Sequence, residues 1–235
     1  MTATATDSGF RHGSGRISLD FIRTLRHRGT PDAAEELPDA RALAAWITQF
    51  GPCPAGAAAV AAGEGAAGQS EAGQHTGAGA GPTRGSAGHA GASAGHTGAS
   101  AGAEQAVVRA RRLREAVFAL IAAAREQGGA GSAPAAERQT VNEMAALPAP
   151  TPQLDPAGAV RWETSDPVSA TLALIARDAI DLVASPVIAR VRDCANPECG
   201  AMFLDVSRPG SRRWCSMNTC GNQAKKTTLR SKRAV

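Results

Sequence analysis

Two pairs of cysteines near the end of the chain constrain its fold more than any other feature. Each pair has the spacing Cys-x4-Cys, with Cys194 and Cys199 in the first pair and Cys215 and Cys220 in the second. Two thiolates spaced in this way on a tight turn can reach one metal ion, and two such turns supply the four sulfur ligands of a tetrahedral zinc site. We therefore predict one structural Zn²⁺ ion bound by these four cysteines, because a four-cysteine shell leaves no open position for catalysis.

Two other roles are open to the cysteines. Disulfides are disfavoured because the first 15 residues lack the apolar core of a secretory signal, so we expect a cytoplasmic protein in a reducing compartment. A redox dithiol normally has two residues between its cysteines rather than four. No apolar run reaches the roughly 18 residues that a membrane helix needs, so we expect no membrane partner.

The net charge of +4 hides a division between the two parts of the chain. From Arg190 onward, ten Lys and Arg residues outnumber three Asp and Glu residues, so this region carries +7 and the remainder −3. Some of these cations can balance the net −2 of zinc with four thiolates, and the excess favours contact with the phosphates of double-stranded DNA. The predicted DNA-binding residues are Arg208, Arg212, Arg213, Lys225, Lys226, Arg230, Lys232 and Arg233.

Before this basic module, hydrophobic periodicity predicts a mainly α-helical domain over residues 16–186. One short helix should begin near Ile17 and stop by Gly29, and Asp39 should cap the second. The further predicted helices cover about 104–127, 134–147 and 167–184, and Ser165 or Asp166 should cap the last of them. A small β-hairpin is expected around Asp155–Gly158. The arginines at 109, 111, 112 and 114 should form the solvated side of their helix.

Two segments should lack regular structure. Residues 54–102 consist largely of Ala, Gly, Ser, Thr and His, and include the tandem heptads GHAGASA and GHTGASA. Such a segment cannot offset the entropy lost when its glycines are ordered, so we predict a disordered insert. We also expect a flexible N-terminus over residues 1–15.

The expected architecture of residues 187–235 is a β-hairpin followed by a short helix. Strands at Ala201–Val206 and Arg212–Cys215 would place Phe203 and Trp214 inside, and Asn222 would cap a helix over Ala224–Arg233. A unit this small has too little core to fold alone, so zinc binding should supply much of its folding free energy.

Two parts of the chain resemble a known family. The segment FLDVSRPGSRRWCSMNTCGNQAKKTTLRSKR resembles the CGNR zinc finger, although Gln223 stands where the arginine of that tetrapeptide is expected. LDFIRTLRHRG and LPDARALAAWI resemble the start of the ABATE domain, which precedes the CGNR finger in that family, although members often carry Asn at the position of Arg23. The resemblance implies a stress-induced transcription regulator.

Residues and resemblance together predict a zinc-dependent DNA-binding transcriptional regulator. Its helical domain would sense a small-molecule effector or dimerise, and would pass a change of state through the connector Pro186–Asp193. One alternative is an adaptor whose finger binds a protein, and another is a small-molecule-binding protein in which the finger is a structural cap. No catalytic constellation is recognisable, so we do not expect an enzyme. The sequence makes no prediction about oligomeric state.

Overall fold

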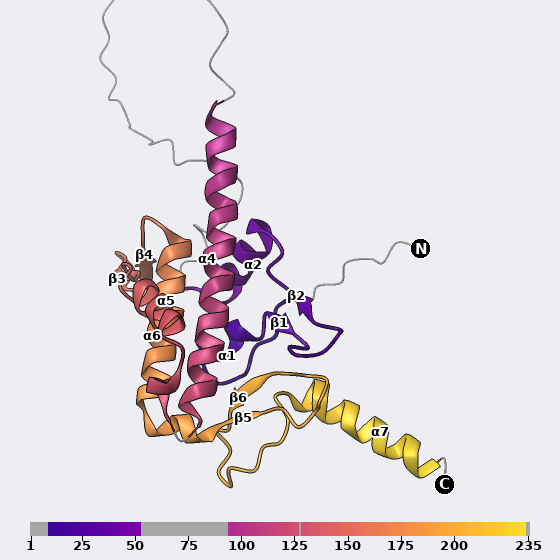
Figure 1. Ribbon diagram of the computed structural model, residues 1–235. Helices are drawn as coiled ribbons and strands as arrows, with labels where there is room; N and C mark the ends of the chain where they lie inside the picture. Colours follow the sequence, from indigo (N-terminus) through magenta and orange to yellow (C-terminus); the bar gives the residue numbers. More distant parts are fainter. Residues whose placement is uncertain (1–8, 53–93, 127, 234–235) are drawn as a thin grey trace, which may run out of the picture.

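The chain forms a bundle of helices with a small domain at one end (Figure 1). The computed structural model describes residues 9–52, 94–126 and 128–233. Three helices pack against one another, namely α4 (Ala94–Ala124), α5 (Ala135–Ala145) and α6 (Pro167–Ala184). Two further helices pack against α4 and α6, namely α1 (Ile17–Ile22) and α2 (Ala40–Phe50). In the described part of the chain, no helix combines the length and the apolar character of a membrane span.

Two of these helices begin at the predicted caps. The carboxylate of Asp39 accepts a hydrogen bond from the backbone N–H of Ala42 at 2.8 Å, at the start of α2. Asp166 accepts one from the N–H of Ser169 at 3.0 Å, and Pro167 follows it in the first turn of α6. These bonds satisfy N–H groups that have no partner inside the helix, which stabilises each end by about 1 kcal/mol.

The core of the bundle is built around Trp46. Its ring meets Phe21 edge-on at 5.1 Å between centroids and stacks on Phe50 at 4.7 Å. The other largest fully buried side chains of the bundle are aliphatic: Leu19, Leu37, Leu43, Ile47, Leu113, Ile121, Leu172, Ile175 and Leu182. Burying a side chain of this size contributes roughly 2 kcal/mol, so the bundle has an apolar core of its own.

The first helix is shorter than predicted and ends at Ile22. The backbone N–H and the hydroxyl of Thr24 both donate to the carbonyl of Phe21, at 3.1 and 2.8 Å, and close the last turn. The following residues form a two-stranded antiparallel ladder, β1 (Leu25–Arg26) with β2 (Ala34–Glu35). The apolar period that predicted a longer helix therefore includes a strand residue, Leu25.

Helix α4 begins earlier than predicted. Its first residues, 94–102, fall within the range 54–102 in which we expected disorder. The alanines of that segment have the highest helix propensity, and extending a helix that is already packed avoids the cost of nucleation. The remainder of the predicted insert, 54–93, lies outside the described residues.

After α4, the chain passes through the short helix η1 (Ala130–Ser132) and α5 into the predicted hairpin. Its strands are β3 (Thr151–Leu154) and β4 (Val160–Glu163), which pair antiparallel. The carboxylate of Asp155 accepts hydrogen bonds from the N–H groups of Ala157 and Ala159, both at 2.9 Å, and this sets the turn. The hairpin is therefore confirmed.

The finger differs from the predicted hairpin in its strand pairing. Helix η2 (Pro186–Arg190) leads into it, and its strands are β5 (Val191–Asp193) and β6 (Met202–Leu204), which pair antiparallel. Residues 212–215 form no strand. The buried carboxylate of Asp205 accepts hydrogen bonds from Ser207 N and Oγ and from Arg212 N, at 2.9, 2.6 and 3.0 Å. The segment after β6 therefore folds around a carboxylate instead of returning as a strand.

Residues 9–15 lie against the folded domains, whereas we expected flexibility up to residue 15. The carbonyl of Ser14 accepts a hydrogen bond from Leu204 N in β6 at 2.8 Å, and Ser14 is fully buried. Phe10 exchanges two hydrogen bonds with the side chain of Gln49 on α2, at 2.8 and 2.7 Å. This segment therefore bridges the bundle and the finger.

Candidate zinc centre and nucleic-acid interface

The backbone of the finger brings the two cysteine pairs together. Cys194 directly follows β5, and the N–H of Cys199 closes a turn onto the carbonyl of Asn196 at 2.9 Å. In the second pair, Cys215 lies two residues before a helical turn, η3 (Met217–Gly221), and Cys220 lies within that turn. Each pair therefore lies on a compact turn, as the spacing predicts.

Gly200 lets the first turn lie close to the bundle. Its φ is +61°, in the left-handed region, and a Cβ at this position would lie 2.7 Å from the carbonyl oxygen of Arg28. A larger residue would be strained and would also push Arg28 away. The turn that carries the first cysteine pair therefore packs directly against Arg28, in the segment that follows α1.

The four thiols form a buried cluster of the size that one zinc ion requires. All four sulfur atoms lie within 4.8 Å of one another, and the four residues are buried. Cys215 Sγ is 3.5 Å from Cys199 Sγ and 3.6 Å from Cys220 Sγ. A tetrahedral ion with Zn–S bonds of about 2.3 Å places its ligands about 3.8 Å apart. The cluster therefore fits one structural zinc ion.

The chemistry of the cluster also calls for a cation. The pKa of Cys194 is lowered, first because Cys199 and then because Cys215 donates a hydrogen bond to it. The same contact with Cys194 raises the pKa of Cys199 to about 11 and also raises the pKa of Cys215. One thiolate thus opposes ionisation of its neighbours, and a bound Zn²⁺ removes this opposition by supplying positive charge to all four.

Several N–H groups point at the sulfur atoms. The backbone N–H of Cys215 donates to Cys194 Sγ at 3.5 Å, and Asn196 Nδ2 lies 3.8 Å from Cys220 Sγ. Asn196 Nδ2 also donates to Gln223 Oε1 at 3.3 Å, so the residue that departs from the CGNR tetrapeptide stays beside the cluster. Arg23 Nη2, from the bundle, lies 3.9 Å from Cys215 Sγ. Such contacts orient metal ligands and stabilise their negative charge.

The helix after the second pair begins before the predicted cap. Asn222 has helical φ and ψ angles, and its side chain donates to the carbonyl of Asn218 at 3.1 Å. The cap is Ser216, whose hydroxyl accepts a hydrogen bond from Thr219 N at 3.4 Å. The turn η3 therefore continues without a break into α7 (Asn222–Arg233). Because Cys220 lies in that turn, the metal site anchors the start of α7.

Helix α7 extends away from the rest of the molecule (Figure 1). Its residues Lys225, Lys226 and Arg230 are exposed, and no ion pair involves them among the residues described. Lys232 and Arg233 also lie in α7, but their side chains are outside the described part of the structure. The predicted interface residues of this helix are thus carried on one protruding element.

The predicted arginines of the loop differ in their surroundings. Arg208 and Arg213 are exposed, and the guanidinium of Arg213 lies 5.3 Å from the ring centroid of Trp214. Arg212 instead points inward: it donates to the carbonyls of Trp214, at 2.8 Å, and Cys215, and it lies 4.6 Å from the ring centroid of Phe203. Its Nη2 also lies 3.4 Å from the carbonyl of Gly13, so Nε and Nη2 of Arg212 are bound to carbonyls of the finger and of the N-terminal segment.

The sequence analysis missed two residues of this region. Arg23 was not proposed near the metal, although a cation four positions after Leu19 stands on the apolar side of the first helix, which is an unusual place for it. Asp205 is the only carboxylate between the cysteine pairs, and its spacing from Ser207 is typical of an Asx turn. Both signals were available from the residues alone.

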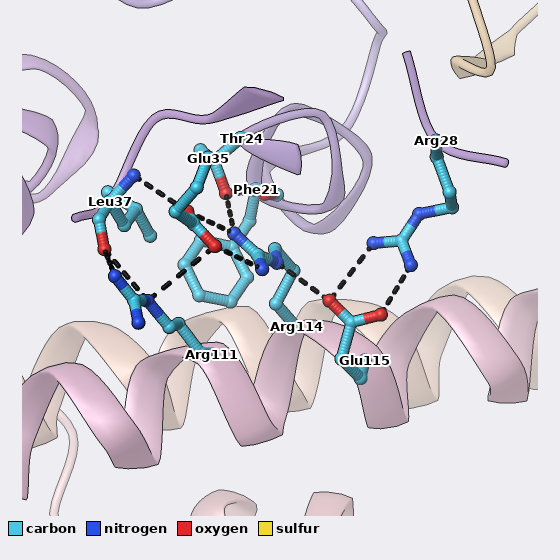
Figure 2. A network of polar contacts seen from close by, with 8 residues as sticks. All are labelled: Phe21, Thr24, Arg28, Glu35, Leu37, Arg111, Arg114 and Glu115. Atoms are coloured by element: carbon cyan, nitrogen blue, oxygen red, sulfur yellow. Dashed lines mark hydrogen bonds and ion pairs between the residues drawn. The ribbon is translucent and has the colours of Figure 1, made fainter. Parts of the chain in front are cut away.

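The arginines of α4 are also placed differently from the prediction. Arg114 is buried and pairs with Glu35 and Glu115, at 2.7 and 2.9 Å, and Arg28 pairs with Glu115 from the other side (Figure 2). Arg111 donates twice to the carbonyl of Leu37, at 2.9 and 2.7 Å. These side chains join α4 to the segment of β1 and β2. We therefore assign them a structural role, and only Arg109 and Arg112 are on the exposed side, as expected.

Burial and pairing act in opposite directions on the two carboxylates. Burial alone would raise the pKa of Glu35, but hydrogen bonds from Arg114 and from the N–H of Leu37 outweigh it, so this pKa is lowered. The pKa of Glu115 is lowered for the same reason, through Arg28 and Arg114. Both groups are held as carboxylates, which suits ion pairing and not proton transfer.

Comparison with known families agrees with this arrangement. The ABATE family, described as "Putative stress-induced transcription regulator", matches residues 15–186. The CGNR zinc finger matches residues 190–233. No curated protein gives a significant match to the chain. The two matches confirm the predicted resemblance and the order of the two domains, and both families are regulatory or zinc-binding rather than enzymatic.

Proposed function

We propose that this chain, which belongs to the ABATE family and ends in a CGNR zinc finger, is a zinc-dependent DNA-binding regulator of transcription. The observation that carries the proposal is the protruding helix α7, on which Lys225, Lys226 and Arg230 are exposed and have no ion pair within the described residues. The zinc site anchors the start of this helix, so the metal would fix the direction in which those cations face. The ion itself has a structural role and takes part in no reaction.

The electrostatics favour nucleic acid as the partner. The region from Arg190 onward carries +7, and no acidic residue follows Asp205 in the sequence. Lys225, Lys226 and Arg230 are exposed within a helix of 12 residues. A helix of this size is about 18 Å long, and the major groove of about 12 Å admits one. Cations on such a helix gain affinity by releasing the counterions of the phosphates.

The proposed interface is narrower than the predicted one. Arg208 and Arg213 on the loop would add phosphate contacts beside α7, and Lys232 and Arg233 would extend the helical set. Arg212 is left out, because its Nε and Nη2 donate to backbone carbonyls and its guanidinium lies over the ring of Phe203. Phosphate contacts supply affinity and register, so we do not assign base recognition to any of these residues.

The test is duplex binding by zinc-loaded protein, measured by fluorescence anisotropy of a labelled DNA duplex with and without a chelator. We expect binding that is lost on chelation and restored by added Zn²⁺. A matched comparison between Arg213→Gln and Arg212→Gln separates the two kinds of arginine. The first should weaken binding of a fully folded protein, whereas the second should impair zinc retention. Zinc-loaded, folded protein that ignores every duplex would refute the proposal.

A second candidate function is binding of a protein by the finger, and exposed apolar residues favour it. Leu229 on α7 is 58% exposed and Met217 on η3 is 52% exposed, which is unusual for large apolar side chains near a phosphate-binding face. An acidic partner with an apolar stripe would match both the cations and these residues. Leu229→Ala should then abolish the interaction, whereas duplex affinity should change little if DNA is the partner.

For the helical domain we propose effector sensing or dimerisation as the regulatory input. Its apolar core and buried ion network make it a stable body that contacts the finger through residues 9–15 and the connector. A thermal-shift screen of zinc-loaded protein with small molecules, together with the mass in solution from light scattering, tests the two roles separately. No thermal shift and a monomeric mass would contradict both.

A further inference from the structure

One side chain of the bundle ends at the metal site of the finger. Arg23 is the residue that terminates α1, and its side chain is 5% exposed. Its Nη2 lies 3.9 Å from Sγ of Cys215, a zinc ligand 192 positions later in the sequence. Within the described residues, it is the one charged side chain outside the finger with a hydrogen bond to a ligand sulfur.

Several contacts fix the guanidinium in this position. Nη1 donates to Ser14 Oγ at 2.7 Å and lies 3.5 Å from the carbonyl of His12. Asp20 is 3.6 Å from the same nitrogen and also accepts a hydrogen bond from Ser14 N at 2.9 Å. The carbonyl of Ser14 in turn binds β6 of the finger through Leu204 N. Ser14 therefore connects the arginine to the finger by side chain and backbone alike.

The contact between Arg23 and Cys215 is shielded from water. Both residues are buried, so solvent screens the charges at their contact poorly. Arg11, Arg26 and His27 line a small pocket beside Arg23 and Cys199. His27 Nδ1 also lies 2.5 Å from the carbonyl of Glu198, next to a zinc ligand.

Charge explains why a cation belongs here. Zinc with four thiolates carries a net −2, and burying that charge without compensation is unfavourable. Asp20 offsets part of the charge of Arg23, but the arginine directs a donor at a ligand sulfur. Donors in this position commonly change metal affinity by 10- to 100-fold when they are removed.

We propose that the zinc site is shared between the two domains, with Arg23 as a positioning residue that links zinc occupancy to docking of the bundle on the finger. Linkage of this kind is reciprocal. Zinc binding tightens the junction through Cys215, Arg23 and Ser14, and any change that moves α1 or residues 9–15 weakens the hold on zinc. This inference is independent of the proposed DNA binding, because it concerns only metal and junction.

The test uses the full chain and two substitutions of Arg23. Arg23→Met removes the charge and keeps the length, and Arg23→Lys keeps the charge but not the planar fork. Zinc affinity is measured by competition with a chromogenic chelator. We expect about a tenfold loss for Arg23→Met and a smaller loss for Arg23→Lys. Arg41→Met is the matched control, because Arg41 is exposed on α2, and its affinity should equal that of the wild type.

A second readout follows the helical domain. The zinc-dependent rise in its unfolding temperature, measured by circular dichroism at saturating Zn²⁺ and after chelation, should shrink in Arg23→Met and persist in Arg41→Met. Wild-type zinc affinity and an unchanged rise in a folded Arg23→Met would overturn the proposal. If that variant does not fold, Ser14→Ala decides: it keeps the charge but removes the hydroxyl that orients it, and zinc affinity equal to the wild type would again refute the linkage.

Discussion

Helices α4 and α7 carry similar runs of cations, and the structure uses them in opposite ways. On α4, Arg111 and Arg114 are tied to carbonyl and carboxylate oxygens of the β1–β2 segment (Figure 2). On α7, Lys225, Lys226 and Arg230 are exposed and have no ion pair within the described residues. A run of basic residues is therefore not a binding surface by itself. What matters is whether the fold brings carboxylates to it.

The difference lies in residues remote from each helix. Glu35 is 79 positions away from Arg114 and reaches it because β2 lies over α4. No acidic residue follows Asp205 in the sequence, and the carboxylate of Asp205 is used by Ser207 and Arg212. Within the described residues, Lys225, Lys226 and Arg230 of α7 have no ion pair, and this leaves them available to a polyanion.

The largest expected effect comes from removing zinc, which anchors α7 but not α4. Chelation of zinc should unfold the finger, since structural zinc contributes on the order of 10 kcal/mol to folding of such modules. The apolar core around α4 should remain folded, with a lowered unfolding temperature. Circular dichroism should show partial loss of helix together with complete loss of duplex binding. Duplex binding that survives chelation would place the interface outside the finger.

The next effect concerns α4. Arg114→Met should destabilise the protein by about 2 kcal/mol, because the partly exposed Glu35 and Glu115 lose a buried partner but keep Arg111 and Arg28. Urea unfolding measures this change, and Arg109→Met, an exposed arginine of the same helix, should leave the stability within about 0.5 kcal/mol of the wild type. Duplex affinity of the folded variant should be unchanged. A loss of affinity at constant stability would assign Arg114 to the interface instead.

On α7 we expect the opposite result, in which duplex affinity changes and stability does not. The triple substitution of Lys225, Lys226 and Arg230 by alanine should weaken duplex binding about a hundredfold near 0.1 M salt, because each phosphate contact releases about one counterion. Urea stability should stay the same. The matched control replaces three exposed arginines elsewhere, Arg41, Arg109 and Arg112, and so changes the net charge equally. An equal loss in the control would indicate a general charge effect rather than an interface.

The smallest effect is the response to acid. The pKa values of Glu35 and Glu115 are lowered by their arginine partners, so these groups stabilise the fold fully above their ordinary pKa of 4.5. That contribution is lost as the pH falls through the lowered folded-state values. Urea unfolding between pH 7 and about pH 3 should therefore show less pH dependence in Glu35→Gln/Glu115→Gln than in the wild type. The α7 variant should titrate like the wild type.

Local chemistry was sufficient to predict much of the molecule. Asp39 and Asp166 mark their helices because an N-cap needs only a side chain and the next turn. The zinc cluster follows from cysteine spacing, since two compact turns meet around one ion. Asp155 likewise sets the predicted hairpin within a few residues. The caps and the hairpin depend on contacts between neighbours in the sequence, and the zinc cluster on two local turns joined by a short loop.

Some features that differed from prediction depend on contacts between distant residues, and others on local hydrogen bonds that hydrophobic periodicity does not describe. Leu25 fits the apolar period of α1, but pairing with Glu35 draws it into a strand. The segment 212–215 was expected to pair with β6, but the N–H of Arg212 donates to the carboxylate of Asp205 instead. The strand β6 pairs with β5. Arg23 reaches Cys215 only once both domains have docked. Hydrophobic periodicity does not predict contacts between residues that are far apart in the sequence.

The salt dependence of duplex binding tests the proposed role of α7 most directly, because it counts the phosphate contacts that this helix would make. The logarithm of the association constant is plotted against that of the salt concentration for zinc-loaded wild type and the α7 triple variant. We expect the variant's slope to be shallower by about 0.9 per lost phosphate contact, up to roughly 2.7. Identical slopes in the two proteins would contradict the claim that the unpaired cations of α7 contact DNA.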